Sequence, residues 1–259
     1  MTRPRALVLR APGINCERET AYALETAGAD AELVHVKALC ATPARLDRFA
    51  ILVVPGGFSY GDDIAAGRVL ANQLRQRLGD ALLGFVDRGG LVLGICNGFQ
   101  VLARLGLLPR TEGREFVQQV TLSPNLSDHY ECRWVTLASP ENRCVFVEKG
   151  LRLRVPAAHG EGYVAVPDAE FCDVLEREGY VAFHYVDAEG RPTTRYPENP
   201  NGSPRGIAGL TDRTGQVLGL MPHPDRAFLP FHPPDWRRTG LARDPDGMSL
   251  FRAVVRAAR

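Results

Sequence analysis

The segment 91–100, Leu-Val-Leu-Gly-Ile-Cys-Asn-Gly-Phe-Gln, runs from an apolar strand through a glycine-flanked cysteine into a helix. The Gly-x-Cys-x-Gly spacing predicts a sharp turn that holds Cys96 in a sparsely populated backbone conformation, with Gly94 and Gly98 removing Cβ atoms that would clash. The thiol then lies at a helix N-terminus, where unpaired N–H groups favour the thiolate that attacks carbonyl carbon. These glycines argue against a merely buried structural cysteine, but the turn alone is equally typical of hydrolases and amidotransferases.

His223 and Asp225 are the candidate partners of this thiol. A cysteine that attacks an amide needs a nearby acid–base group, and an imidazole in that role needs a third group to orient it. Residues two apart at an extended strand end project to the same side, and Pro224 biases His223 towards extended geometry. We therefore predict a triad of Cys96, His223 and Asp225. The similar tetrapeptide at 232–235 lies in a Pro-rich, Arg-rich loop, and we interpret it as a surface turn.

A glycine-rich loop at 55–61, Pro-Gly-Gly-Phe-Ser-Tyr-Gly, follows another predicted strand. Ligands bind at the carboxyl ends of strands in open α/β sheets, so this loop and Cys96 can converge. The backbone N–H groups of Gly56 and Gly57, together with that of Asn97, then suit an oxyanion hole. A tight turn is the other role of the two glycines, and both roles can hold.

Composition limits the classes of partner. The 259 residues include 31 basic and 30 acidic ones, for a net charge of +1 with no block of like charge, so we expect no nucleic-acid partner. The six cysteines are scattered and none has metal-ligand spacing, so we interpret them as reduced thiols and expect no metal site. No signal peptide or membrane-spanning run is recognisable, so we expect a cytoplasmic protein with no membrane partner.

Short apolar runs alternate with helical patterns in the first half of the chain. This alternation predicts an α/β fold: a doubly wound, mostly parallel, flavodoxin-like sheet with helices on both faces. Asn15 is expected to cap the first helix, and Asp62 or Asp63 the second, whose apolar positions are Leu70, Leu74 and Leu78. The expected strands are 6–9, 31–36, 51–54 and 91–95, and the first helix is 15–27.

The second half predicts additional β-strands that pack beside the first sheet or extend it. With no repeat or linker visible, we expect one domain over 1–259. A hairpin is expected to precede the Met-Pro-His-Pro-Asp segment that carries His223. The expected strands are 117–122, 133–137, 151–155, 181–186, 207–210 and 217–220, and a last helix is 248–258.

Four dispersed motifs together resemble a known family. They are Gly-Ile-Cys-Asn-Gly-Phe-Gln at 94–100, Pro-Gly-Gly-Phe-Ser-Tyr-Gly-Asp-Asp at 55–63, Ala-His-Gly-Glu-Gly at 158–162 and Tyr-Pro-Glu-Asn-Pro-Asn-Gly-Ser at 196–203. In this combination and order they resemble the glutaminase subunits of phosphoribosylformylglycinamidine synthase, which are triad (class I) glutamine amidotransferases. The resemblance runs from about Ala6 to Arg226.

The resemblance implies that Cys96 attacks the side-chain amide of glutamine. His223 would protonate the departing ammonia and activate the water that hydrolyses the glutamyl thioester, and Asp225 would orient His223. By the same resemblance Gly57 and Asn97 supply the oxyanion hole.

The substrate itself would be held by Gln100 and by the glycine loop with Gly56 and Phe58. His159 and Glu161 would line the same pocket. From spacing alone, Gln100 is equally an amide on a helix surface.

Two features depart from the family. Asp225 stands where the family usually has glutamate, and we expect activity to survive the shorter side chain. The segment 227–247 is longer than in the compact bacterial subunits and is rich in Pro, Arg and aromatic residues. We take it as a candidate partner-docking extension, with a plain surface loop as the alternative.

The chain carries neither of the two common phosphate-binding glycine motifs, so we expect no cofactor in this subunit. The resemblance implies a synthetase partner that binds ATP and magnesium and converts formylglycinamide ribonucleotide to formylglycinamidine ribonucleotide in de novo purine biosynthesis. It also implies a channel for ammonia and a small third subunit. The alternatives are an amidotransferase for another acceptor, a catalytically silent glutamine-binding regulatory subunit, and a cysteine hydrolase or peptidase.

Overall fold

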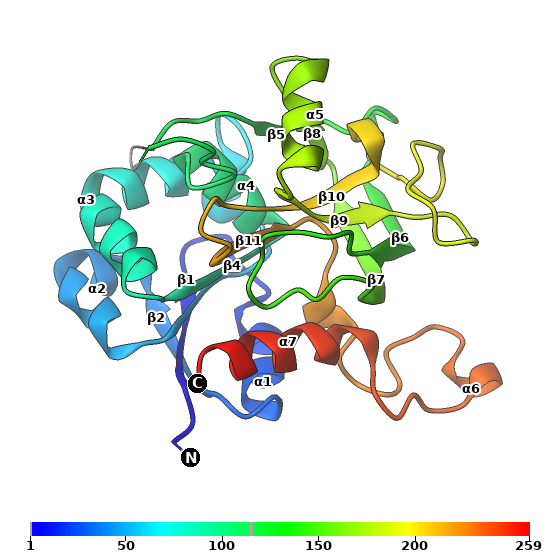
Figure 1. Ribbon diagram of the computed structural model, residues 1–259. Coiled ribbons are helices and arrows are strands. Elements are labelled where there is room, and N and C mark those ends of the chain that lie inside the picture. The colour runs from blue at the N-terminus through cyan, green and yellow to red at the C-terminus, as the bar shows by residue number, and fades with distance from the viewer. Residues whose placement is uncertain (1, 114–115) are drawn as a thin grey trace.

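A nine-stranded sheet forms the centre of the computed structural model, which describes residues 2–113 and 116–259 (Figure 1). The strand order is β2-β1-β3-β4-β11-β10-β9-β6-β7, and β5 pairs with β8 in a separate two-stranded sheet. The strands of the large sheet are β1 Arg5–Arg10, β2 Asp30–His35, β3 Ile51–Val54, β4 Leu91–Ile95, β6 Glu131–Ala138, β7 Arg152–His159, β9 Val181–Tyr185, β10 Ile207–Thr211 and β11 Val217–Leu220.

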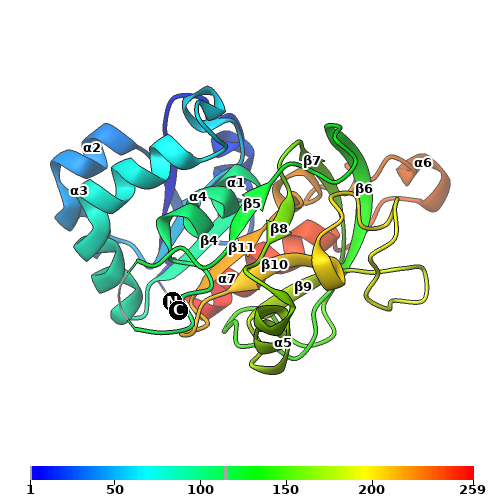
Figure 2. The same cartoon turned by 90° about the horizontal axis from the view of Figure 1, so that it is seen from above.

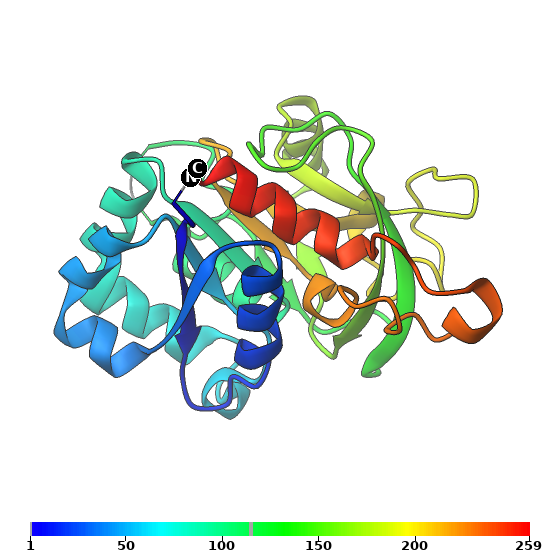
Figure 3. The same cartoon turned by 90° about the horizontal axis from the view of Figure 1, so that it is seen from below.

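The strands β2, β1, β3, β4 and β11 pair in parallel, and the apolar side chains of β1, β3, β4 and β11 are buried because helices cover both faces. Figure 2 shows α3 and α4 on one face, and Figure 3 shows α1 and α7 side by side on the other. The predicted doubly wound sheet is therefore confirmed. The helices are α1 Glu17–Thr26, α2 Val36–Ala41, α3 Arg68–Asp87, α4 Asn97–Leu105, α5 Ala169–Arg177, α6 Trp236–Thr239 and α7 Asp246–Ala257.

The expected extra strands extend the same sheet. Strands β11, β10, β9, β6 and β7 pair antiparallel, and β10 and β11 form the predicted hairpin. Because β11 also pairs in parallel with β4, the segment after β11 emerges beside the residue that follows β4. This pairing places His223 at the same sheet edge as Cys96.

The strand expected at 117–122 is wrong. Only Thr121–Ser123 is a strand, β5, and it pairs with the unpredicted β8, Tyr163–Ala165, outside the large sheet. The backbone at Val117 instead passes so close to Gly106 that a Cβ on that glycine would lie 2.7 Å from Val117 N. The Gln119 side chain accepts a hydrogen bond from Thr111 N at 2.9 Å, which holds the residues before β5 in a loop conformation.

Both expected helix caps are also wrong. Helix α1 begins at Glu17 without a side-chain cap, because the Asn15 oxygen accepts a hydrogen bond from the Cys16 thiol at 3.2 Å instead. Helix α3 begins at Arg68, and Asp62 lies in a 3-10 turn where its carboxylate accepts a hydrogen bond from the Asn97 amide. The expected apolar positions of α3, Leu70, Leu74 and Leu78, are buried as predicted.

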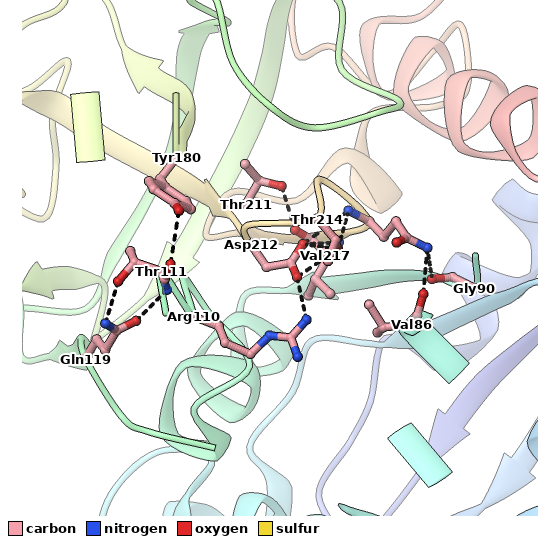
Figure 4. A network of polar contacts seen from close by, with 11 residues as sticks. Val86, Gly90, Arg110, Thr111, Gln119, Tyr180, Thr211, Asp212, Thr214 and Val217 are labelled. Carbon is pink, nitrogen blue, oxygen red and sulfur yellow. Dashed lines mark hydrogen bonds and ion pairs between the residues drawn. The ribbon is translucent and has the colours of Figure 1, made fainter. Parts of the chain in front are cut away.

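Asp212 organises the turn of the β10–β11 hairpin (Figure 4). Its carboxylate pairs with the buried Arg110 guanidinium at 3.0 Å and accepts a hydrogen bond from the Thr214 hydroxyl at 2.8 Å. It also accepts from the backbone N–H of Gln216, whose side chain reaches the Val86 carbonyl at the end of α3. The hairpin that leads to His223 is thus tied to both α3 and the segment after α4.

The middle of the segment 227–247 projects from the rest of the molecule in all three views, with α6 at its outer end (Figures 1–3), while Ala227 and Phe228 are buried. The two termini lie close together on the opposite side. Across residues 2–113 and 116–259, no helix is long and apolar enough to cross a membrane. All six cysteines are free thiols, as predicted.

Candidate active site

Cys96 lies in the strained turn that its neighbours predict. Its backbone angles are φ 50° and ψ −106°, a sparsely populated region, and it is the N-cap of α4. A Cβ on Gly94 would lie 2.7 Å from Gly98 O, and a Cβ on Gly98 would lie 1.8 Å from Val54 O. Only glycine fits on either side of so tight a bend, so these two residues allow a sharp turn at the carboxyl end of β4.

The Cys96 thiol points towards the carboxyl end of β7. Its Sγ atom lies 3.7 Å from the Ala158 carbonyl oxygen, and the residue is 6% exposed. The Cys96 N–H donates to Leu220 O, the last residue of β11, at 2.8 Å. Cys96 is therefore held between the end of β11 and the carboxyl end of β7.

His223 and Asp225 are both buried and form the predicted pair. His223 Nδ1 lies 3.1 Å from Asp225 Oδ1. The expected extended geometry is confirmed at His223, with φ −105° and ψ 93°, but not beyond it, because Pro224–Arg226 is a 3-10 turn with Pro224 at its first position. Such a turn advances about 2.0 Å per residue against about 3.3 Å in a strand, so the short aspartate side chain reaches the imidazole.

The electrostatics of His223 favour its protonated form. Burial alone would lower the pKa of the imidazole, but the negative charges at Cys96 and Asp225 and the hydrogen bond to Asp225 raise the pKa of His223 well above 6.5. His223 Nε2 is buried and has no hydrogen-bond partner within the described chain, so it is available for a reacting group.

Three residues from outside the predicted triad, Thr20, Arg226 and Cys16, lie around this pair. The Thr20 hydroxyl lies 3.2 Å from Asp225 Oδ2, and Arg226 Nη2 donates to Cys16 Sγ at 3.0 Å. Sequence reasoning missed all three. The only signal was the position of Cys16 just after the loop that follows β1, at the same sheet edge as Cys96.

Cys16, His223 and Asp225 offer one sulfur, one nitrogen and one oxygen atom within 4.8 Å of one another. No other such group of potential metal ligands occurs among the residues that the structure describes. The His223 and Asp225 atoms already bond to each other, and Cys16 contacts Arg226. Burial raises the pKa of the Cys16 thiol, which favours the neutral form rather than the thiolate that binds metals.

Gly57 and Asn97 present backbone N–H groups near the elbow. An antiparallel bridge pairs Gly57 with Ile14. Its hydrogen bonds run from Phe58 N to Gly13 O and from Asn15 N to Gly56 O, so the bridge does not use the Gly57 N–H. Gly57 has φ 143°, and a Cβ there would lie 2.7 Å from Gly13 O. The Asn97 N–H is at the first position of α4, where no intrahelical acceptor exists.

Gly56 and Phe58, on either side of Gly57, have different surroundings. A Cβ on Gly56 would lie 2.7 Å from His223 Cε1 and 3.1 Å from Cys16 Sγ, so the imidazole packs directly on this backbone. Phe58 is half exposed at the surface of the same loop.

Gln100 lies in a chain of side-chain hydrogen bonds. Its oxygen accepts from Asn97 Nδ2 at 2.9 Å, and its amide donates to the Glu161 carbonyl oxygen at 2.6 Å. Asn97 in turn accepts from Ser59 N at 3.1 Å. Gln100 is 4% exposed, so the helix-surface interpretation is wrong and its amide joins α4, the glycine loop and the loop after β7.

His159 is buried and neutral. Burial, together with the nearby His223, lowers its pKa to about 3. Asn125 Nδ2 donates to the His159 carbonyl, and Asn125 Oδ1 accepts from Gly162 N, so His159 Nδ1 carries the proton in its 3.0 Å contact with that oxygen. The Nε2 lone pair of His159 is left without a partner in the described residues.

Comparisons with known proteins agree with this geometry. Residues 3–256 match the CobB/CobQ-like glutamine amidotransferase domain. A Dehalococcoides mccartyi protein named phosphoribosylformylglycinamidine synthase subunit PurQ is 43% identical over 262 residues, covering 100% of this chain and 99% of that protein. A PurQ from Archaeoglobus fulgidus is 40% identical over 97% of this chain and 96% of its own length.

Solved structures agree with the observed fold. A chain of the structure described as PurLQS from Thermotoga maritima is 32% identical, with a TM-score of 0.74 and 100% of both chains covered. A glutamine amidotransferase from Thermotoga maritima, 16% identical, shares the fold with a TM-score of 0.50 over 87% of this chain and 77% of its own. The chain belongs to the PurQ family of CobB/CobQ-like glutamine amidotransferases.

Proposed function

We propose that this chain is the glutaminase subunit of phosphoribosylformylglycinamidine synthase, with Cys96, His223 and Asp225 as its catalytic residues. The observation that carries the proposal is the strained Cys96 elbow beside a buried His223–Asp225 pair. A cysteine nucleophile, a buried acid–base group and an orienting carboxylate are what amide cleavage through a thioester requires. We treat residues 1–259 as one catalytic domain, and the single sheet spanning β1 to β11 supports this.

In the proposed reaction, each bond change and each proton transfer is carried out by one named residue. The Cys96 thiolate attacks the side-chain carbonyl carbon of glutamine, forming the C–S bond and a tetrahedral oxyanion. As that intermediate collapses, protonated His223 delivers a proton to the leaving nitrogen, and ammonia departs from a glutamyl thioester. His223 then takes a proton from water, whose oxygen attacks the thioester and releases glutamate and the Cys96 thiolate.

The N–H groups of Gly57 and Asn97 support the oxyanion. Both are backbone donors fixed by the bridge and by the helix start, so they need no reorganisation as charge develops on the substrate oxygen. Removing one such donor typically costs about 10²- to 10³-fold in kcat.

The groups proposed to hold glutamine are Gln100, the loop with Gly56 and Phe58, His159 and Glu161. Gln100 contributes mainly by fixing the Asn97 and Glu161 segments, because its amide already bonds to both. The unpaired Nε2 of neutral His159 is an acceptor suited to a donor group of the substrate.

Ammonia formed here would be used by a synthetase partner together with a small third subunit. The name PurLQS of the Thermotoga maritima assembly and the PurQ names of the relatives support such partners. ATP and magnesium would bind to the synthetase, which converts formylglycinamide ribonucleotide to formylglycinamidine ribonucleotide, and this subunit would need no cofactor of its own. The six free thiols are consistent with a cytoplasmic location, which we propose.

Glutamate release from glutamine tests the proposal. Wild type and Cys96→Ala are each assayed alone and with the synthetase and small subunits, ATP and formylglycinamide ribonucleotide. We expect release that the partners stimulate and that Cys96→Ala abolishes. Release that is indifferent to these partners would indicate another acceptor. Glutamine binding without any release would indicate a catalytically silent regulatory subunit.

A further inference from the structure

Asp225 reaches His223 with only one of its two carboxylate oxygens. Oδ1 contacts His223 Nδ1 at 3.1 Å, while Oδ2 has a single hydrogen-bond partner in the described residues, the Thr20 hydroxyl at 3.2 Å. Rotation about the last bond of an aspartate side chain is soft, so one contact does not fix the carboxylate plane. Two contacts on different oxygens do fix it.

Thr20 comes from a distant part of the chain. It is fully buried in α1, which packs on the turn Pro224–Arg226 that carries Asp225, although 205 residues separate the two side chains. Because both Thr20 and Asp225 are 0% exposed, water cannot replace this donor if it is lost. A buried carboxylate oxygen left without a donor is costly.

The Thr20 hydroxyl proton has two possible acceptors. Cys16 O lies 2.7 Å from it, the ordinary contact of a helical threonine with the preceding turn. That carbonyl already accepts the Thr20 backbone N–H at 3.1 Å, whereas Asp225 Oδ2 has no other donor in the part of the chain that the structure describes. An ionised carboxylate is also the stronger acceptor, so the proton is directed to Asp225.

Other charged or titratable groups surround His223 and Asp225, but among the described residues none of them donates to Asp225 Oδ2 as Thr20 does. Arg226 directs its guanidinium to Cys16 Sγ, and Cys16 and Cys96 face His223. Arg226 interacts with Asp225 only through its charge, with no hydrogen bond to the carboxylate in the described residues. Thr20 is therefore the group that sets the orientation of Oδ2.

We propose that Thr20 is a positioning residue of the glutaminase: its hydroxyl holds the short Asp225 carboxylate in the plane that orients His223. The inference rests on the proposed function. It identifies a physical means by which the short side chain of Asp225 is held in a fixed orientation. Thr20 acts on glutamine cleavage through Asp225 and His223 and does not touch the substrate.

Two substitutions separate the hydroxyl from the shape of the side chain. Thr20→Val keeps the shape and removes the hydroxyl, and Thr20→Ser keeps the hydroxyl and removes the methyl group. In the assembled synthase we expect Thr20→Val to lower kcat for glutamate release roughly ten- to a hundredfold, a loss typical of a misplaced catalytic group, with KM within about twofold. Thr20→Ser should retain most of the activity.

A double-mutant cycle tests the route of the effect. Asp225→Asn removes the charge that Thr20 holds, so adding Thr20→Val to Asp225→Asn should change kcat by less than about twofold. Thr20→Ala, which introduces no new bulk, is the second variant should Thr20→Val fail to fold, and it is expected to lose the same activity.

Several results would overturn the inference. These are a Thr20→Val enzyme with wild-type kcat, equal losses in the Val and Ser variants, a change confined to KM, or an undiminished loss in the Asp225→Asn background. Failure of the proposed function is distinguishable, because wild-type enzyme would then release no glutamate, or would release as much as Cys96→Ala.

Discussion

Position 56 shows how closely the proposed catalytic residue His223 packs on the backbone. A Cβ added to Gly56 would lie 2.7 Å from His223 Cε1, nearer than real Cβ contacts come, and the ring is buried. We expect Gly56→Ala to displace the imidazole and to lower kcat roughly a hundredfold, as for a misplacement of about 1 Å.

Steady-state glutamate release by the assembled synthase measures this effect. Gly84→Ala is the matched control, because nothing lies within 4 Å of a Cβ at that position. A Gly56→Ala enzyme with the activity of the control would show that His223 can shift without loss, against the tight geometry described above.

His159 gives a prediction about pH. Its pKa is about 3 in the folded protein, against about 6.5 when unfolded, so between these values the unfolded chain binds the extra proton. The stability that neutral His159 contributes is complete above pH 6.5 and is lost as the pH falls towards 3. At pH 5 the loss is about 2 kcal/mol.

Urea unfolding at pH 7 and pH 5 tests this contribution. His159→Asn retains a donor for Asn125 but cannot take up a proton, so its free energy of unfolding should fall less over this interval than that of wild type. Equal falls in the two proteins would contradict a neutral, buried His159.

At the scale of elements, the hairpin β10–β11 carries His223 to Cys96 and depends on Asp212. This carboxylate is 0% exposed and neutralises Arg110, which is 1% exposed. Asp212→Ala leaves a buried guanidinium without its partner and removes the acceptor of the hairpin turn. We expect it to lower the free energy of unfolding by about 3–5 kcal/mol.

Denaturant unfolding of Asp212→Ala beside Glu141→Ala measures the difference. Glu141 forms an exposed ion pair with Lys149, so its loss should change stability by less than about 1 kcal/mol. Similar effects for the two substitutions would show that the buried pair does not brace the hairpin.

The elements that position the nucleophile were predictable because their signals are local. The continuous apolar strands β3 and β4 and the glycines around Cys96 follow from steric rules that act within a few residues. The 3-10 turn at Pro224–Arg226 was not predictable, because proline at its first position is equally compatible with an extended chain. β5 was misplaced because Val117 packs against Gly106, a contact that the apolar pattern does not encode.

The residues of the site likewise divide into those that local signals predict and those that only the folded structure brings together. The residue types and the family resemblance were enough to predict the roles of Cys96, His223 and Asp225. Thr20 has no such signal, because its contact with Asp225 exists only once α1 packs on the turn that follows β11. Arg226 and Cys16 likewise meet only in the folded chain.

At the scale of the whole molecule, the projecting segment 227–247 is the candidate surface for a partner subunit. It exposes Phe231 by 55% and Leu241 by 61%, while Asp235 anchors it to β7 through Arg154 at 2.9 Å. Large apolar side chains held at a fixed surface are typical of interface anchors. We expect Phe231→Ser and Leu241→Ser together to weaken the affinity for the synthetase at least about tenfold.

Titration of the labelled glutaminase with the two partner subunits measures this affinity. Leu33→Ser, which changes a 38% exposed leucine on β2, is the control. If the double variant binds as tightly as wild type, the segment is a plain surface loop.

The central claim, that Cys96 is the nucleophile of a glutaminase, is tested most directly by covalent capture in the assembled synthase. A diazoketone analogue of glutamine takes up a proton at its diazo carbon, forms a thioether with an attacking thiolate and releases dinitrogen, and peptide mass spectrometry then locates the adduct. We predict one adduct, on Cys96, formed more slowly when glutamine is added, while Cys16 beside His223 stays unmodified. An adduct on Cys16, or labelling of Cys96 that glutamine does not slow, would contradict the account.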